Sequence, residues 1–314
     1  MDFAEIIGHD KIKSQILREI KLNRFSHAHI IVGEDGIGKS IIALETAKII
    51  VNNKKTGFST DIIEYKLREN RKSIGIDDIK NIIDETSKKP YEGNKKVIIV
   101  YNADLITETA QNAFLKTIEE PFEGVYIILL CEKMDNILDT IQSRCAVYKL
   151  SRLKDDEMIE FLNKRFPSLS HEEKKSIIAF SDGIPGRAEK FIQDTSFHEI
   201  RNTSLDLLKD LNNGDLDVIS KYSSFLFKYR TEWKELFTCI LSYIRDVFVY
   251  KETANQEMLI NRDKFYDIKL IGEMFSFSKL SYIIDIIKRA EKKLEANVNP
   301  NLVFNSIILK MQEV

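Results

Sequence analysis

The sequence predicts an α/β fold for its first half and an all-α fold for the rest. Up to about residue 150, short strand-like runs alternate with helical segments, which is typical of a parallel sheet with right-handed crossovers. A glycine-rich segment at 33–40 links one of these strands to a helix. Beyond residue 150, nearly every segment has helical periodicity, which favours a helical bundle.

Apolar runs in the first half predict strands that are buried on both faces, as a parallel sheet requires. These runs lie at 27–33, 97–101, 125–131 and 146–150. Apolar residues at helical spacing predict helices over 40–53 and 107–121, and Pro121 ends the second of these.

The second half is expected to form short helices and then a bundle. Helices are predicted over 155–166, 171–180 and 186–193. Apolar stripes follow, and we interpret most of them as the core of a bundle rather than as partner-binding surfaces. Two such stripes are Leu280, Ile283, Ile284 and Ile287, and Phe304, Ile307, Ile308 and Met311.

Composition narrows the classes of protein to consider. Lys and Arg number 47 against 49 Asp and Glu, so the net charge gives no sign of a nucleic-acid-binding surface. A local basic patch is still compatible with this net charge. Cys131, Cys145 and Cys239 are far apart, which disfavours a zinc site and fits a reducing cytoplasm. The charged N-terminus is unlike a signal peptide, and no run of 18 apolar residues predicts a membrane span.

The segment GEDGIGKS at 33–40 matches the phosphate-loop pattern G-x-x-x-x-G-K-[ST] at every fixed position. Its glycines let backbone N–H groups turn toward phosphate oxygens, and the following helix adds positive potential at its N-terminus. Lys39 is expected to reach the β- and γ-phosphates, and Ser40 to ligate Mg²⁺. The segment therefore predicts binding of ATP or ADP with Mg²⁺; the alternative is a glycine-rich turn without a ligand. The predicted binding residues are Gly33, Gly36, Ile37, Gly38, Lys39 and Ser40.

The segment KKVIIVYNADLI at 95–106 lacks the groups that hydrolysis requires. A hydrolytic site needs a carboxylate that holds Mg²⁺ and a group that orients the attacking water. The chain has Tyr101 and Asn102 at these places, and neither a phenol nor an amide replaces a carboxylate. Asp104 is either a weak substitute or a helix-capping residue, and we favour the cap. The sequence thus predicts an intact phosphate cradle with impaired hydrolysis.

Several segments together resemble the delta-prime family of bacterial DNA polymerase III clamp-loader subunits, which are AAA+ proteins. They are RFSHAHIIVGEDGIGKS (24–40), SIGIDDIK (73–80), KKVIIVYNADLITETAQNAFLKTIEEP (95–121), TIQSRC (140–145), GIPGRAEKF (183–191) and ANVNPNLVFNSIILKM (296–311). The resemblance covers essentially the whole chain. It implies an AAA+ phosphate-loop domain over 1–150, a small helical lid domain over 151–197 and a helical collar domain for oligomerisation over 198–314.

The resemblance also implies partners. Such subunits work in a hetero-pentameric ring with gamma/tau and delta subunits, and through the ring they act on the sliding clamp and primer-template DNA. Arg144, in the SRC motif, corresponds to an arginine lent in trans to the ATP site of a neighbouring subunit. A guanidinium can stabilise charge on a transferring γ-phosphate. The alternative for Arg144 is a surface salt bridge.

The chain departs from its relatives at two places. Residues 51–61 contain no cysteine where many clamp-loader ATPases carry a zinc module, so no zinc is expected. Gly186, followed by Arg187, stands where active gamma-type subunits have a nucleotide-sensing arginine, which weakens the case for a nucleotide-driven lid. His27 and His29 lie on the strand that leads into the phosphate loop, and we interpret both as structural.

We therefore expect a cytoplasmic clamp-loader subunit that is non-catalytic or weakly catalytic on its own. One alternative is an active gamma/tau-like ATPase motor, which the residues at 101 and 102 disfavour, as does the end of the chain at 314 without the long extension of tau. Another is a stand-alone phosphate-loop NTPase, which the SRC and collar segments disfavour. Polymerase catalysis is not implied, since no two-metal carboxylate site is evident, although such subunits are grouped with the nucleotidyltransferases of the DNA-directed DNA polymerase holoenzyme.

Overall fold

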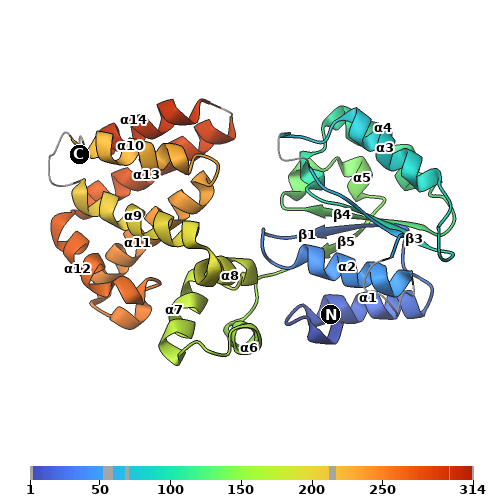
Figure 1. Ribbon diagram of the computed structural model, residues 1–314, viewed down its shortest axis with the longest axis horizontal. Helices are drawn as coiled ribbons and strands as arrows, with labels where there is room; N and C mark the ends of the chain where they lie inside the picture. The colour runs from blue at the N-terminus through green and yellow to red at the C-terminus, as the bar shows by residue number, and fades with distance from the viewer. Residues whose placement is uncertain (1–2, 52–58, 68–70, 212–216, 297, 313–314) are drawn as a thin grey trace. The chain divides into compact units, whose positions relative to one another are not determined.

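The chain forms two compact units (Figure 1). The structure is a computed structural model that describes residues 3–51, 59–67, 71–211, 217–296 and 298–312. The first unit consists of Met1–Pro167 with Gly183–Gly186, and the second of Ser168–Asp182 with Arg187–Val314. None of the helices in these described ranges combines the length and the apolarity needed to cross a membrane.

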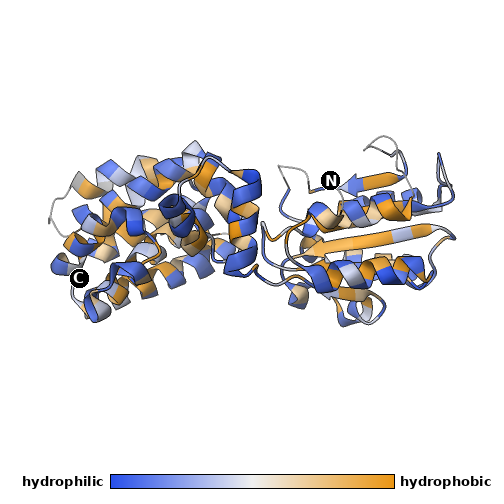
Figure 2. Cartoon of the chain, turned by 90° about the horizontal axis from the view of Figure 1, so that it is seen from below, coloured by the Kyte–Doolittle hydropathy of each residue, from blue (hydrophilic) through white to orange (hydrophobic). Residues whose placement is uncertain are grey.

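A five-stranded parallel sheet forms the centre of the first unit. Its strands are β1 (Ala28–Val32), β2 (Ile62–Tyr65), β3 (Lys96–Val100), β4 (Val125–Cys131) and β5 (Ala146–Lys149), in the order β2-β3-β4-β1-β5. Every residue of β1 and β3 is buried, and Figure 2 shows strongly apolar strands between the helices. Burial on both faces explains the unbroken apolar runs. Because all pairings are parallel, the C-terminal ends of the strands meet at one edge.

Helices cover both faces of this sheet. The helices that lie wholly within the first unit are α1 (Asp10–Lys21), α2 (Lys39–Ile50), α3 (Ile76–Ser87), α4 (Glu108–Glu119), α5 (Asp139–Gln142) and α6 (Asp155–Arg165), with short 3-10 turns η1 (Phe3–Glu5), η2 (Ala103–Leu105) and η3 (Met134–Asn136). Figure 1 shows α1 and α2 on one face and α3, α4 and α5 on the other. On the second face, Phe114 of α4 is fully buried in a cluster with Ile98 and Ile127. The sheet is thus enclosed, and its C-terminal edge is where loops can form a site.

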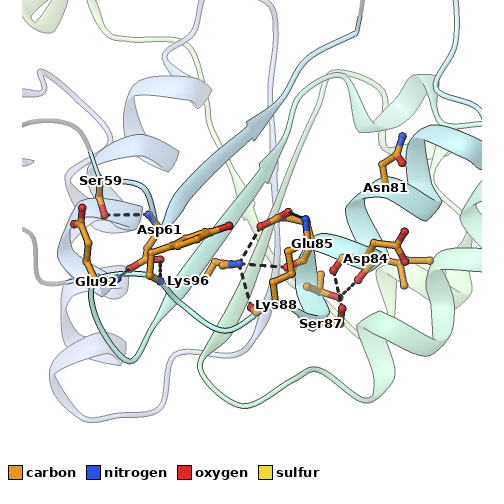
Figure 3. Close-up of polar contacts among 12 residues, drawn as sticks. Ser59, Asp61, Asn81, Asp84, Glu85, Ser87, Lys88, Glu92 and Lys96 are labelled. Carbon is orange, nitrogen blue, oxygen red and sulfur yellow. Dashed lines mark hydrogen bonds and ion pairs between the residues drawn. The ribbon is translucent and has the colours of Figure 1, made fainter.

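A polar network fixes the edge of the sheet at which β3 begins (Figure 3). The buried carboxylate of Asp61 accepts three successive backbone N–H groups, those of residues 91–93, at 2.6, 3.0 and 3.2 Å. Lys96 has no exposed surface, and its ammonium lies 3.0 Å from a carboxylate oxygen of Glu85. Each buried charge is therefore compensated. This network serves structure, because it anchors the connection between α3 and β3.

The second unit is entirely helical in its described part. Its helices are α7 (His171–Ser181), α8 (Pro185–Gln193), α9 (Thr195–Asp210), α10 (Asp217–Lys228), α11 (Trp233–Thr253), α12 (Phe265–Met274), α13 (Phe277–Glu295) and α14 (Pro300–Gln312), with 3-10 turns η4 (Gln256–Met258) and η5 (Arg262–Lys264). The first two residues of α8 are counted with the first unit. A capping box starts α7, since Ser170 and Glu173 each accept the backbone N–H of the other.

One apolar core holds the bundle together. The stripes of α13 and α14 meet α11 there, with Tyr243, Ile283 and Phe304 nearly fully buried. The prediction that most stripes are bundle core is confirmed. The sequence missed β2, a short edge strand whose residues are half-buried or exposed and which therefore lacks a continuous apolar run. The division into three domains at 150 and 197 stays a prediction.

His29, in β1, has a structural environment. Its ring has no exposed surface, stacks on Phe25 with 3.7 Å between centroids, and faces Tyr148 at 5.4 Å. Its Nε2 donates to the carbonyl oxygen of Ser26 at 2.7 Å. Burial lowers the pKa of His29 to about 4, although the Ser26 carbonyl acts in the opposite direction. The imidazole is therefore neutral at pH 7, in agreement with the structural role expected for it.

We predict that His29 makes the first unit less stable in acid. The unfolded imidazole binds a proton near its ordinary pKa of 6.5, while the folded one does so only near 4. Its contribution is thus fully present above pH 6.5 and is lost as the pH falls toward 4, by at most about 1.4 kcal/mol per pH unit. Calorimetric unfolding from pH 7 to 4.5 should show a shallower decline for His29→Phe, which keeps an aromatic ring. Parallel curves for the two proteins would contradict this origin.

Candidate functional site: the phosphate loop and its surroundings

The phosphate loop lies between β1 and α2, at the C-terminal edge of the sheet. Gly33 directly follows β1, and its N–H donates to the carbonyl oxygen of Cys131 at 3.2 Å, which ties the loop to the end of β4. Gly36 and Gly38 have φ angles of 77° and 107°. Glycine adopts these left-handed conformations readily, and they turn the chain over the start of α2.

The N-terminus of α2 is open to an anion. Its N-cap residue, Gly38, has no side chain to cap the helix, so the first-turn N–H groups, including that of Ser40, have no acceptor within the helix. A Cβ built on Gly38 would meet no described atom within 4 Å. Open space next to uncapped donors fits a phosphate group. For Mg²⁺ the loop offers the hydroxyl of Ser40, at the place where such a ligand is expected.

Lys39 lies against the loop's own backbone. Its Nζ donates to the carbonyl oxygens of Gly33 and Glu34, at 2.8 and 2.9 Å. Phosphate oxygens are stronger acceptors than these neutral carbonyls, because hydrogen bonds between ions are shorter and stronger. The ammonium can therefore exchange one set of partners for the other. On the outside of the loop, Arg152 forms a two-pronged ion pair with Glu34, at 2.5 and 2.9 Å.

Tyr101 is bound to the neighbouring strand. Its hydroxyl donates to Oε2 of Glu64 in β2 at 2.5 Å, and Nζ of Lys66 lies 4.7 Å from its ring centroid. Burial and this carboxylate raise the pKa of Tyr101, so the group stays a phenol at neutral pH. Asn102 has a φ of 52° and starts the turn η2. Neither side chain is a carboxylate that could take up Mg²⁺ in the usual way.

The expectation that Asp104 caps a helix is wrong. Its Oδ2 accepts the backbone N–H of Lys133 at 3.2 Å, whereas the N-cap residue of α4 is Thr107. The turn η2 intervenes between β3 and α4, so the carboxylate of Asp104 lies beside the segment after β4. Its Oδ1 is buried without a hydrogen-bond partner among the described residues. Whether Asp104 can substitute for the missing metal ligand stays an open alternative.

Arg144 lies between α5 and β5 and has partners in its own chain. Its Nε is 2.6 Å from Oε1 of Glu119, and its guanidinium also donates to the carbonyl oxygen of Thr140 at 2.9 Å. The side chains of Arg144 and Glu119 are 40% and 42% exposed. The salt bridge considered as an alternative is therefore present, and its exposure leaves the guanidinium accessible from outside.

The structure gathers the six predicted loop residues at one edge of the sheet and places Arg144 outside the loop. Two contacts of the loop were missed. The N–H of Gly186 donates to the carbonyl oxygen of Gly36 at 2.9 Å, and Nε2 of His9 to that of Ile37 at 3.2 Å. The one sign in the sequence of the contact between Gly186 and Gly36 is that Gly186 is the second glycine of the segment GIPG (183–186). The absence of zinc stays a prediction, because 52–58 lie outside the described residues.

The strand order β2-β3-β4-β1-β5, the glycine-rich loop after β1 and the helical C-terminal unit define an AAA+ protein. Two sequence models match the chain, DNA polymerase III, delta subunit, over residues 8–154 and DNA polymerase III, delta subunit, C terminal, over residues 196–313. The chain belongs to this family of DNA polymerase III clamp-loader subunits.

Two relatives and one solved structure illustrate what the chain is similar to. The DNA polymerase III subunit delta' of Bacillus subtilis is 25% identical, over 96% of both chains. A DNA polymerase III subunit gamma of Buchnera aphidicola is 30% identical, over 51% of this chain and 48% of its own. A crystal structure of a DNA polymerase III gamma subunit-related protein from Thermotoga maritima aligns over 95% of this chain and 99% of its own, with 19% identity and a TM-score of 0.47.

Proposed function

We propose that this chain is a clamp-loader subunit that binds ATP or ADP but hydrolyses it poorly or not at all. The proposal rests on a contrast between two parts of one site, the start of α2 and the residues that follow β3. The uncapped N-terminus of α2 and the turn at Gly38 suit a phosphate. Across the sheet edge, Tyr101 is bound to Glu64 where a metal-binding carboxylate would be needed.

Arg144 is proposed to complete the ATP site of a neighbouring subunit. Its exposure supports this role, because a guanidinium must reach beyond its own chain to act in trans. The ion pair with Glu119 would hold the side chain in place until a γ-phosphate competes for it. A phosphate carries more charge than a carboxylate and matches the planar fork of arginine, so such an exchange is chemically reasonable.

The proposed partners are gamma/tau and delta subunits in a five-membered ring in the cytoplasm, with the sliding clamp and primer-template DNA reached through the ring. Relatives named as delta', gamma and tau support this setting. The rival proposal is an active gamma/tau-like motor, which the similarity to a gamma subunit favours. The residues at 101 and 102 speak against it. The two proposals differ in whether the isolated chain turns over ATP.

The first prediction from this proposal is that the purified chain binds ADP with Mg²⁺. Lys39→Ala should weaken binding by roughly ten- to a hundredfold, because it removes charge-assisted hydrogen bonds to phosphate. Isothermal calorimetry measures both affinities. Lys80→Ala, which alters an exposed lysine of α3, is the matched control and should bind like the unmodified chain. No binding of ADP at millimolar concentration would show that the cradle is vestigial.

The second prediction is that the isolated chain shows negligible ATP turnover. Without a carboxylate at 101 or 102, neither the metal ion nor the attacking water is held in place. Phosphate release should stay far below about 1 per second, the lower end for typical enzymes. Turnover on that order, lost in Lys39→Ala, would instead establish the motor.

The third prediction concerns the reconstituted complex. Arg144→Ala should leave nucleotide binding by this chain unchanged but reduce clamp- and DNA-stimulated ATP hydrolysis and clamp loading. Trans arginines contribute about 10³–10⁵ in rate in GTPases, and one site among several gives a smaller effect here. Arg144→Lys should rescue poorly, because an ammonium lacks the planar fork.

The ion pair supplies the matched control for this experiment. Glu119→Gln removes the negative charge of the ion pair with Arg144 and keeps the guanidinium, so stimulated hydrolysis should be retained. Unchanged activity of Arg144→Ala would assign the arginine to the salt bridge alone.

A further inference from the structure

Residues Gly183–Gly186, here termed the clasp, lie directly against the backbone of the phosphate loop. The N–H of Gly186 donates to the carbonyl oxygen of Gly36 at 2.9 Å. A Cβ built on Gly186 would lie 2.6 Å from Cα of Gly36, closer than real Cβ atoms approach backbone, and 3.1 Å from the oxygen of Gly36. Ile184, which has no exposed surface, lies against the same residue. The contact therefore requires glycine at position 186.

The other end of the clasp is fixed equally tightly. Gly183 has a φ of 74°, and its carbonyl oxygen accepts the N–H of Leu153 at 2.8 Å. A Cβ built on Gly183 would lie 2.4 Å from the carbonyl oxygen of Leu153. The chain leaves the second unit after Asp182, runs through the clasp, and re-enters the second unit at Arg187. These four residues are thus held to the first unit at both ends.

A side chain binds the next carbonyl of the loop. Nε2 of the part-buried His9 lies 3.2 Å from the carbonyl oxygen of Ile37, and since a carbonyl only accepts, Nε2 carries the proton. Burial lowers the pKa of His9, so the ring is neutral at pH 7. Two consecutive carbonyls of the loop, at 36 and 37, are therefore engaged by groups outside the loop.

These contacts determine the direction of the loop's donors. In a trans peptide the C=O and the following N–H point in opposite directions. Binding of the Gly36 carbonyl by the clasp turns the N–H of Ile37 away from Gly186, and binding of the Ile37 carbonyl turns the N–H of Gly38 away from His9. The Ile37 N–H has a long hydrogen bond, 3.3 Å, to Glu34 within the loop. No described atom lies within 4 Å of a Cβ built on Gly38, so the loop is open on that side of the residue.

We propose that the clasp and His9 are positioning elements, which hold the phosphate loop in the shape that binds an anion before the anion arrives. This inference rests on the proposed nucleotide binding and deepens it. A loop that is already ordered loses less conformational freedom when a phosphate arrives, so the same contacts give a higher affinity. Glycine at position 186 then serves nucleotide binding, because the Cβ of any other residue would separate the clasp from Gly36.

The test uses two pairs of variants of the full chain. Gly186→Ala inserts a Cβ into the contact, and its control is Gly272→Ala in α12, where a Cβ would meet nothing closer than 3.6 Å. His9→Phe removes the donor and keeps a ring, whereas His9→Gln keeps a donor. Amide hydrogen exchange at 36–38 without nucleotide, and ADP affinity by calorimetry, are measured for each variant.

Gly186→Ala and His9→Phe should speed exchange at 36–38 and weaken ADP binding by roughly three- to tenfold each, the worth of one hydrogen bond. Gly272→Ala should match the unmodified chain, and His9→Gln should restore most of both properties. A folded Gly186→Ala with unchanged exchange overturns the proposal. If Gly186→Ala does not fold, the two His9 variants decide, and equal loss in both of them counts against positioning. If the unmodified chain binds no ADP, the proposed nucleotide role fails, while exchange at 36–38 still tests the clasp.

Discussion

The burial of β1 and β3 on both faces is the constraint on which the site depends. Strands without an exposed face are largely apolar and must be covered by helices, which favours polar functional groups at the ends of the strands. Because the strands are parallel, these ends share one edge. The phosphate loop and the residues after β3 both lie beyond C-terminal strand ends for this reason, whereas the segment before β5 lies at the N-terminal end of its strand.

The phosphate loop itself is stabilised by hydrogen bonds to its carbonyl oxygens. Lys39 binds the first two of them, the clasp binds that of Gly36, and His9 binds that of Ile37. Buried or half-buried backbone oxygens need such partners in the absence of water. The first-turn N–H groups of α2 have no acceptor within the helix and are left for a ligand. The loop thus combines order with available donors, a combination suited to binding.

In the proposed function, binding and hydrolysis separate because they depend on different elements. The cradle depends on the β1–α2 connection, whereas hydrolysis depends on carboxylates after β3, where Tyr101 is hydrogen-bonded to Glu64. Under the same proposal, the subunit takes part in a ring through its structure and through a lent arginine. The exposed ion pair of Arg144 with Glu119 keeps such an arginine ordered while leaving it accessible. The electrostatic gain of an exposed pair is small, so little opposes its exchange for a phosphate.

The sequence by itself determined the α/β and all-α halves, four of the five strands and the phosphate loop, because continuous apolar runs, helical periodicity and a glycine pattern are local signals. It also showed the missing carboxylates at 101 and 102. It did not reveal β2, whose edge position removes the apolar pattern, or the partner of Asp104, which comes from beyond β4. The contact of Gly186 with Gly36 joins residues 150 positions apart through backbone atoms alone, and a contact without side chains leaves almost no trace in sequence. Tertiary structure decided these features, because only folding brings distant backbone groups within hydrogen-bonding distance.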